Sequence, residues 1–265
     1  MIFNGALATI GLILLTLAAD QLVLGSSQLA RRLRISPVVV GVVVIGLGTS
    51  APEFLVSGMA AARGDTGLAI GNIVGSNILN VTLVLGLAAL IAPVAVRSVV
   101  VRREAPVAVA AVAVFALAAW VGLGLVVGVL LLVPLVVVLV MLVRWANDRA
   151  DPALDPQVLE FAAADRPDRV TIMVLRAVLG LAGVLLGAQL LVVNAASIAG
   201  RLGVSPVVIG FTLVALGTSL PELVTTVQAQ RRRETDLVVG NLLGSNLFNS
   251  LAGGAVIGLA AGTGQ

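Results

Sequence analysis

Long apolar segments alternate with short polar ones along almost the whole chain. Eight of these segments are about 17 residues or longer, and a helix of about 20 apolar residues crosses the hydrocarbon core of a membrane. The fourth and fifth segments meet at Gly122 and Gly124, which favour a turn. The pattern predicts an all-α polytopic membrane protein with eight spans, at residues 2–25, 37–62, 68–92, 105–121, 123–143, 172–194, 204–229 and 237–261.

Arginine residues mark one side of the predicted membrane. The 16 basic residues are all arginine. If the eight spans alternate in direction, all of them except Arg63 and Arg201 fall on the same side. Because loops rich in basic residues stay in the cytoplasm, we expect a multi-pass protein of the plasma membrane. Its N-terminus should lie outside and its main loops should be cytoplasmic.

An internal repeat relates the two halves of the chain. At a fixed offset of 169, residues 32–80 align with residues 201–249 without a gap, and 23 of 49 positions are identical. Five predicted crossings separate the copies, so the copies are inverted in the membrane, as in secondary transporters. We expect a first repeat at residues 1–145, a cytoplasmic linker at 146–170 and a second repeat at 171–265.

Each repeat carries a glutamate directly after a proline, inside an apolar segment. A carboxylate near the centre of a membrane helix costs about 3 kcal/mol or more, so Glu53 and Glu222 are predicted to be functional. The alternative is a glutamate near a helix end that reaches water. Thr49 and Ser50 lie four and three residues before Glu53 and share its helix face. A set of oxygens with one charge per repeat suits a hard cation such as Ca²⁺.

A second polar stripe follows each glutamate in the next apolar segment. Its members are spaced by four residues and therefore lie on one helix face. Such amides and hydroxyls can simply hold membrane helices together. Two inverted copies, each beside a Pro-Glu helix, favour a cation site instead. The stripes are Asn72, Ser76 and Asn80 in the first repeat and Asn241, Ser245 and Asn249 in the second.

Composition removes several classes of function. The chain is 59% hydrophobic, has no cysteine or histidine, and carries a net charge of +3. Disulfides, thiolate or histidine metal sites and histidine catalysis are therefore excluded. We expect no cofactor and no enzymatic activity. The arginines flank membrane spans, so their charge is no argument for nucleic acid, and the lipid bilayer is the expected surrounding.

Two further polar residues lie in apolar segments. Asp20 and Gln189 occupy equivalent positions in segments 2–25 and 172–194. Asp20 lies close to the predicted cytoplasmic end of its span. Its position is therefore compatible with solvation as well as with a function.

The doubled motifs GTSxPE and GNxxGSNxxN resemble the α-repeats of the sodium/calcium exchangers, in the cation/calcium antiporter superfamily. The resemblance covers residues 2–92 and 172–261. It implies a central ion site in which each repeat supplies one glutamate, hydroxyl and amide oxygens, and one main-chain oxygen. Carried over by motif, the expected metal ligands are Glu53, Thr49, Ser50, Ser76, Asn80 and Gly46, with Glu222, Thr218, Ser219, Ser245, Asn249 and Ala215.

The chain departs from this family in two ways. Asn249 stands where some members carry an aspartate, so only two carboxylates are available. The resemblance also implies ten spans, whereas eight are predicted here. From this difference we expect one side of residues 237–261 to lack a protein neighbour. We also expect a version extended by two helices to exchange ions faster.

The function expected from these features is secondary active exchange of Ca²⁺ for Na⁺. Two glutamates balance one Ca²⁺, and several Na⁺ compete for the same oxygens. Two alternatives remain open. Exchange can be coupled to H⁺, because neighbouring carboxylates raise each other's proton affinity. The chain can also be a non-transporting fragment, or a subunit that needs a partner.

Overall fold

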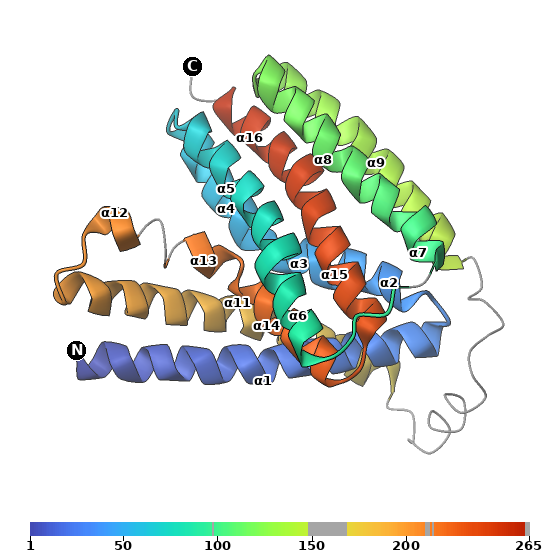
Figure 1. Ribbon diagram of the computed structural model, residues 1–265, viewed down its shortest axis with the longest axis horizontal. Helices are drawn as coiled ribbons and strands as arrows, with labels where there is room; N and C mark the ends of the chain where they lie inside the picture. Colours follow the sequence, from blue (N-terminus) through green and yellow to red (C-terminus); the bar gives the residue numbers. More distant parts are fainter. Residues whose placement is uncertain (97, 148–168, 210–212, 214, 263–265) are drawn as a thin grey trace.

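The structure is a computed structural model that describes residues 1–96, 98–147, 169–209, 213 and 215–262. These residues form only helices and their connections (Figure 1), as the apolar pattern predicts. Stretches labelled η are π-helical. The helices are α1 (Ile2–Leu33), α2 (Pro37–Val40), η1 (Gly41–Gly46), α3 (Leu47–Thr49), α4 (Ala51–Ala62), α5 (Thr66–Leu79), η2 (Asn80–Val84), α6 (Leu85–Ile91), α7 (Ser98–Arg102), α8 (Glu104–Val121), α9 (Leu125–Asn147), α11 (Val170–Arg201), α12 (Pro206–Ile209), α13 (Ala215–Thr218), α14 (Leu220–Arg231), α15 (Thr235–Phe248), η4 (Asn249–Gly253) and α16 (Gly254–Ala261).

Most predicted spans correspond to helices of sufficient length. Six helical stretches are long and apolar enough to cross a membrane: Ile2–Leu33, Thr66–Ile91, Ser98–Val121, Leu125–Trp145, Val170–Arg201 and Thr235–Ala261. A seventh consists of Pro37–Thr49 and Ala51–Ala62, which meet at an angle of 43°. The eighth predicted span, residues 204–229, includes positions outside the described residues. Its described parts are α12, α13 and α14, so its crossing stays a prediction.

The two longest helices, α1 and α11, form an antiparallel pair that runs across the other helices (Figure 1). Glycines allow their backbones to approach. A Cβ atom at Gly187 would lie 2.5 Å from the backbone nitrogen of Leu15, which no side chain tolerates. Close backbone contact through small residues is the usual way in which membrane helices associate. The pair is therefore expected to behave as one unit.

The continuous stretch α15–η4–α16 lies at the centre of the remaining helices. It packs against η1, α8 and α2 through α15, and against α9 and α4 through α16. Of its most apolar stretch, 78% is buried, against 28% for the equivalent stretch Thr66–Ile91 of the first half. The two halves of the repeat therefore have similar sequences but very different surroundings.

The expectation that residues 237–261 lack a neighbour is wrong. Helices α8 and α9 of the first half cover α15 and α16 of the second half. Their contact is close, because a Cβ atom at Gly258 would lie 2.6 Å from the Cα atom of Gly128. The helices pack across the halves, and the stretch α5–η2–α6 has an uncovered face on which Leu68, Ile78, Val81 and Leu90 are exposed. The division into units 1–145, 146–170 and 171–265 stays a prediction, and residues 148–168 lie outside the described ones.

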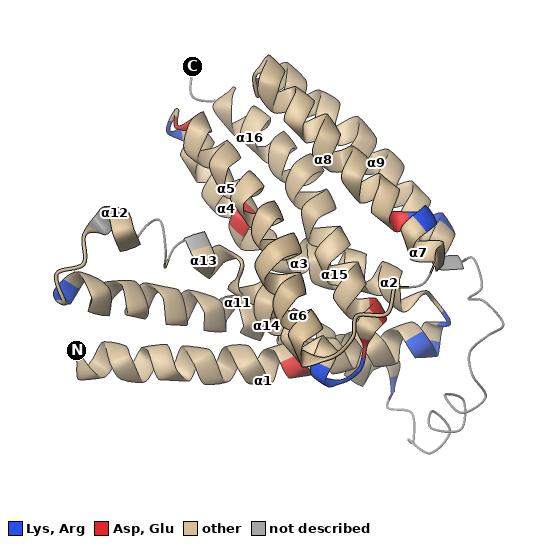
Figure 2. Ribbon diagram, in the orientation of Figure 1, with Lys and Arg blue, Asp and Glu red and all other residues tan. Residues whose placement is uncertain are grey.

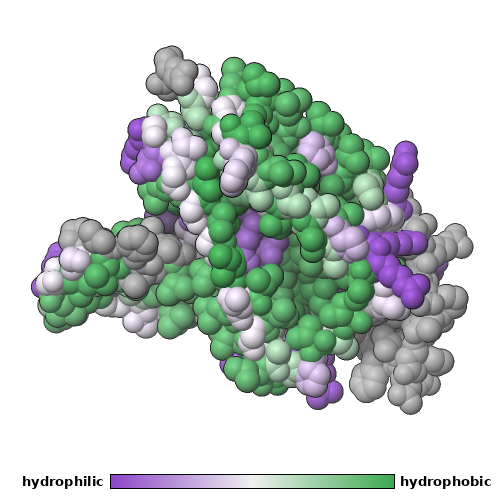
Figure 3. All heavy atoms as spheres, turned by 45° about the horizontal axis from the view of Figure 1, so that its top comes forward, coloured by the Kyte–Doolittle hydropathy of each residue, from purple (hydrophilic) through white to green (hydrophobic). Residues whose placement is uncertain are grey.

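The outer surface suits a lipid environment. Hydrophobic atoms cover most of the face in Figure 3, with hydrophilic atoms in a hollow near its middle and in patches at its edges. Large side chains such as Trp120 and Leu90 are 91% and 83% exposed. Figure 2 shows basic residues gathered near α2, α7 and the C-terminal end of α1, with small patches on the opposite side. A charged end and an apolar belt are typical of membrane proteins.

Candidate functional site

Both predicted glutamates lie in the first turn of a helix that follows a break. Helices α4 and α14 each carry a proline in the first turn, where its missing N–H is not needed. The breaks fall at Ser50 and Ser219, just before these prolines. The side chains of Glu53 and Glu222 are completely buried. The N-terminal end of each helix, with its free backbone N–H groups, therefore lies next to a buried carboxyl group.

Each glutamate is hydrogen-bonded by serines from both halves of the chain. Ser219 Oγ donates to Glu53 Oε1 at 3.2 Å, and Ser50 Oγ donates to Glu222 Oε1 at 3.2 Å. Within its own half, Ser76 Oγ donates to Glu53 Oε1 at 3.3 Å. Ser245 Oγ donates in the same way to Glu222 Oε1 at 3.5 Å. The two copies of the motif therefore meet in one centre with approximate twofold symmetry.

Several buried atoms in this centre have no hydrogen-bond partner among the described residues. They are the second carboxylate oxygens of Glu53 and Glu222, the amide oxygen of Asn80, and both side-chain atoms of Asn249. Buried polar atoms without a partner are rare and costly, so each of them needs an explanation. Ca²⁺ takes six to eight oxygen ligands and accepts carboxylate, amide, hydroxyl and main-chain oxygens. The donor set fits a hard cation.

A second layer of amides holds the main chain at each glutamate. Asn72 Nδ2 donates to Ser57 Oγ at 3.0 Å and to the carbonyl oxygen of Glu53 at 3.4 Å. Asn241 Nδ2 donates to Thr226 Oγ1 at 2.9 Å and to the carbonyl oxygen of Glu222 at 3.3 Å. Both contacts fix the first turn of a broken helix. The asparagines therefore position the carboxylates rather than contact an ion.

The chain is similar in sequence to a known family of membrane proteins. The model of the sodium/calcium exchanger protein family matches residues 4–144 and 172–265. The chain belongs to this family. The protein named "Putative antiporter CaxA" of Alkalimonas amylolytica is 41% identical over 245 residues, covering 92% of this chain and 76% of the relative. The sodium/calcium exchanger MaX1 of Methanosarcina acetivorans is 30% identical over 279 residues, covering 93% and 80%.

Solved structures agree with this assignment. A structure of the sodium-calcium exchanger NCX_Mj, soaked with zero Na⁺ and Ca²⁺, superposes with a TM-score of 0.81 and 36% sequence identity. The match covers 98% of this chain and 83% of that one. The exchanger family, the fold and the all-helical class predicted from the sequence are thereby confirmed. The family supports a cation/Ca²⁺ antiporter for this exchanger.

The remaining predicted ligands of this exchanger differ in whether the structure places them beside the two glutamates. Thr49 Oγ1 donates to the carbonyl of Ile45 at 2.9 Å, and the carbonyl of Gly46 accepts from Ser245 Oγ at 3.3 Å. Thr218 is buried. Ala215 begins α13, directly after a position outside the described residues, so its place relative to the carboxylates stays a prediction. In the described residues no group of three or more acidic, histidine or cysteine side chains could hold a metal. Hydroxyls, amides and carbonyls must therefore complete the coordination of any bound ion.

In the described residues, the π-helical stretches η1, η2 and η4 border the centre, and the sequence pattern did not predict them. η2 begins at Asn80, η4 begins at Asn249, and η1 ends at Gly46. Short π-helices inside α-helices occur mostly at functional sites. Each widens one turn of backbone at a predicted ligand. No periodicity of apolar residues could have revealed them, because a single wide turn shifts the pattern by only one residue.

Sequence reasoning also missed several supporting residues. Ser57 and Thr226 lie four residues after the two glutamates and hold Asn72 and Asn241. Their equivalent positions in the repeat are a signal that could have identified them. Where α5 crosses the second half, Asn77 Nδ2 donates to Ser250 Oγ at 3.0 Å. Asn80 Nδ2 donates to Asn246 Oδ1, also at 3.0 Å. These bonds join the two ligand-bearing stripes.

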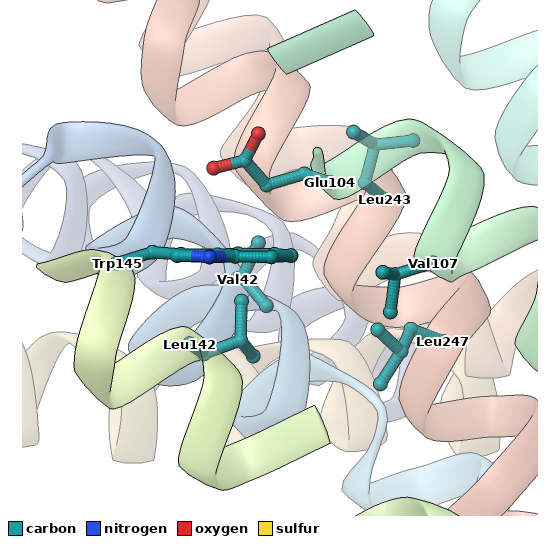
Figure 4. A pocket seen from close by; sticks show the side chains of 7 residues that line it. All are labelled: Val42, Glu104, Val107, Leu142, Trp145, Leu243 and Leu247. Carbon is teal, nitrogen blue, oxygen red and sulfur yellow. The ribbon is translucent and has the colours of Figure 1, made fainter. Parts of the chain in front are cut away.

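A separate small cavity lies outside this centre. It has a volume of about 10 Å³, barely enough for one water molecule. Figure 4 shows the ring of Trp145 edge-on beside the carboxylate of Glu104, with aliphatic side chains around them. None of the predicted ligands lines it, so it lies apart from the centre formed by Glu53 and Glu222. Its lining residues are Val42, Glu104, Val107, Leu142, Trp145, Leu243 and Leu247.

Proposed function

We propose that this chain exchanges Ca²⁺ for Na⁺ through the centre formed by Glu53 and Glu222. One observation carries the proposal. Each buried glutamate has one oxygen held by serines of both halves and a second oxygen without a partner in the part of the chain that the structure describes. A buried carboxyl oxygen of this kind is available as a ligand for a cation that enters and leaves. The proposed ligands are those expected from the sequence, namely Glu53, Thr49, Ser50, Ser76, Asn80, Gly46, Glu222, Thr218, Ser219, Ser245, Asn249 and Ala215.

Exchange follows from competition for one set of oxygens. Two carboxylates balance the charge of one Ca²⁺. Several Na⁺ would use the same oxygens and cannot be bound together with Ca²⁺. Binding and release involve no covalent step, so the protein acts as a transporter rather than an enzyme and needs no cofactor.

Access to the centre would alternate between the two sides of the membrane. The pair α1–α11 runs across the helices that carry the glutamates. Rocking of one body against another around a central site is the usual mechanism of transporters with inverted repeats. We propose that the α1–α11 pair is the body that moves.

An ion flux assay in proteoliposomes tests the proposal. An outward Na⁺ gradient should drive uptake of radiolabelled Ca²⁺, and an Na⁺ ionophore should abolish this uptake. If a pH gradient drives uptake instead, and a protonophore abolishes it, the exchanger is coupled to H⁺. Absence of Ca²⁺ uptake with either gradient would contradict antiport by this chain.

The proposed orientation predicts where single cysteines react. The chain has no native cysteine. Because most arginines lie on one side, Ala150→Cys should react only with reagents inside the cell, although Ala150 lies outside the described residues. Gly67→Cys should react only from outside. Gly67 is exposed and has room for a side chain, whereas neighbouring Gly64 has a φ of 83° that a cysteine would strain. The reverse labelling pattern would show that the orientation is wrong.

A further inference from the structure

Three pairs of polar residues tie the C-terminal half of α1 to the turn between α14 and α15. Asp20 accepts two hydrogen bonds from Arg232, from Nε at 2.6 Å and from a terminal nitrogen at 2.7 Å. Arg31 contacts Glu234 Oε1 at 2.8 Å, and Ser27 Oγ donates to the same oxygen. A bidentate arginine–carboxylate pair is among the stronger and more directional polar contacts. Asp20 is thus one member of an ion pair.

The inverted repeat places an equivalent turn at the opposite end of the molecule. By the offset of 169, Arg63 and Asp65 of the α4–α5 turn correspond to Arg232 and Glu234. These two charges of the turn are therefore kept, whereas Arg231 and Arg233 correspond to Ala62 and Gly64. In the described residues, Asp65 caps α5 by accepting from the backbone N–H of Leu68. Within that described part of the chain, no ion pair joins this turn to α11.

The difference between the two ends lies in the long helices. Asp20, Ser27 and Arg31 of α1 correspond to Gln189, Ala196 and Gly200 of α11. No residue of that second set carries a charge. The sequence therefore places three polar side chains on α1 that can contact the α14–α15 turn. The equivalent positions of α11 carry no charged side chain.

Packing follows the same asymmetry. α1 packs along α14, whereas α11 makes little contact with α4, which is the equivalent helix of the first half. Val224 of α14 is partly buried against the cluster that contains Leu22 of α1. The equivalent residue of α4, Leu55, is 64% exposed. One end of the helix pair is therefore closed onto the core and the other end is not.

We propose that the contacts of Asp20 with Arg232, and of Ser27 and Arg31 with Glu234, form a latch. The latch holds the Arg-rich end of the exchanger closed and makes its two access states unequal in free energy. The α1–α11 pair can move only if these contacts break, and in the described residues no ion pair at the opposite end opposes this movement. The inference rests on the proposed exchange by alternating access. It adds that Asp20, Arg232 and Glu234 determine which side is open at rest.

Two reporter cysteines in the cysteine-free chain test the latch. Val224→Cys reports opening of the latched end, and Leu55→Cys reports the opposite end. In purified protein in detergent, Asp20→Asn should raise the reaction rate of the first cysteine with a small water-soluble thiol reagent by about two- to fivefold, the size expected for partly exposed ion pairs. The rate of the second cysteine should fall. The charge-swapped variant Asp20→Arg/Arg232→Asp should restore both rates.

A matched control lies at the equivalent position of the repeat. Gln189→Asn should leave both rates unchanged, because Gln189 is exposed and makes no hydrogen bond in the described residues. Rates that rise together in Asp20→Asn would indicate general loosening and overturn the proposal. Unchanged rates in Asp20→Asn would also overturn the proposal. The same holds if Asp20→Arg/Arg232→Asp reacts at the same rates as Asp20→Asn.

Ca²⁺ binding and exchange by the same proteins separate the two claims. With the latch broken, Asp20→Asn should still bind and exchange Ca²⁺, because the glutamate centre is intact. The ratio of apparent Ca²⁺ affinities measured from the two sides should change. Failure of the unmodified chain to bind Ca²⁺ would overturn the proposed function. Exchange without opposite changes at the two cysteines would overturn only the latch.

Discussion

Glu53→Gln and Glu222→Gln should each abolish Ca²⁺ exchange while leaving the protein folded. Glutamine keeps the shape of the side chain and one oxygen, but it removes one of the two negative charges of the centre. Two unit charges about 4 Å apart attract by about 4 kcal/mol at an effective dielectric constant of about 20. Loss of this attraction corresponds to binding weaker by about 1,000-fold. The measurement is Ca²⁺ flux per folded molecule, together with equilibrium Ca²⁺ binding.

Glu104→Gln provides the control for this result. Glu104 is also a buried glutamate, 7% exposed, but it lines the separate small cavity beside Trp145. Its replacement removes the same charge without touching the predicted ligands. Exchange per folded molecule should therefore be retained. Normal flux in either Glu53→Gln or Glu222→Gln would show that the assignment of the ion site is wrong.

Gly240→Val should prevent stable folding, whereas Gly71→Val should be tolerated. The two glycines occupy equivalent positions of the repeat and have identical neighbours in the motif. A Cβ atom at Gly240 would overlap the carbonyl oxygen of Val38 and lie 2.9 Å from the Cα atom of Gly41. Both atoms belong to backbone, which cannot move aside. At Gly71 a Cβ atom would meet nothing within 4 Å.

The expected cost at Gly240 is about 3 kcal/mol or more, at the upper end of the usual range for overpacked cores. It should appear as a large fall in melting temperature, or as loss of a monodisperse peak in gel filtration. The Gly71 variant should melt within a few degrees of the parent chain. Equal destabilisation of both variants would mean that α5 is as closely packed as α15, which the structure contradicts.

Much of this protein could be predicted from its sequence. The apolar segments predict membrane helices because no other open structure satisfies its backbone hydrogen bonds in lipid. The doubled Pro-Glu motif identifies Glu53 and Glu222 because a carboxylate is expensive there. The structure then joins their serines across the halves, as an inverted repeat with one central site requires. These features depend on local chemistry, which each segment carries with it.

Other features were decided only by the tertiary structure. The sequence does not distinguish Gly71 from Gly240, and it does not reveal that α8 and α9 cover the opposite half. Nor does it show that Asp20 pairs with Arg232, or that the helix widens at Asn80 and Asn249. All of these depend on which surfaces meet between segments far apart in the chain. Two copies of one motif carry the same local preferences, but their neighbours differ, and those neighbours determine burial, close approach and the contacts that make the two ends unequal.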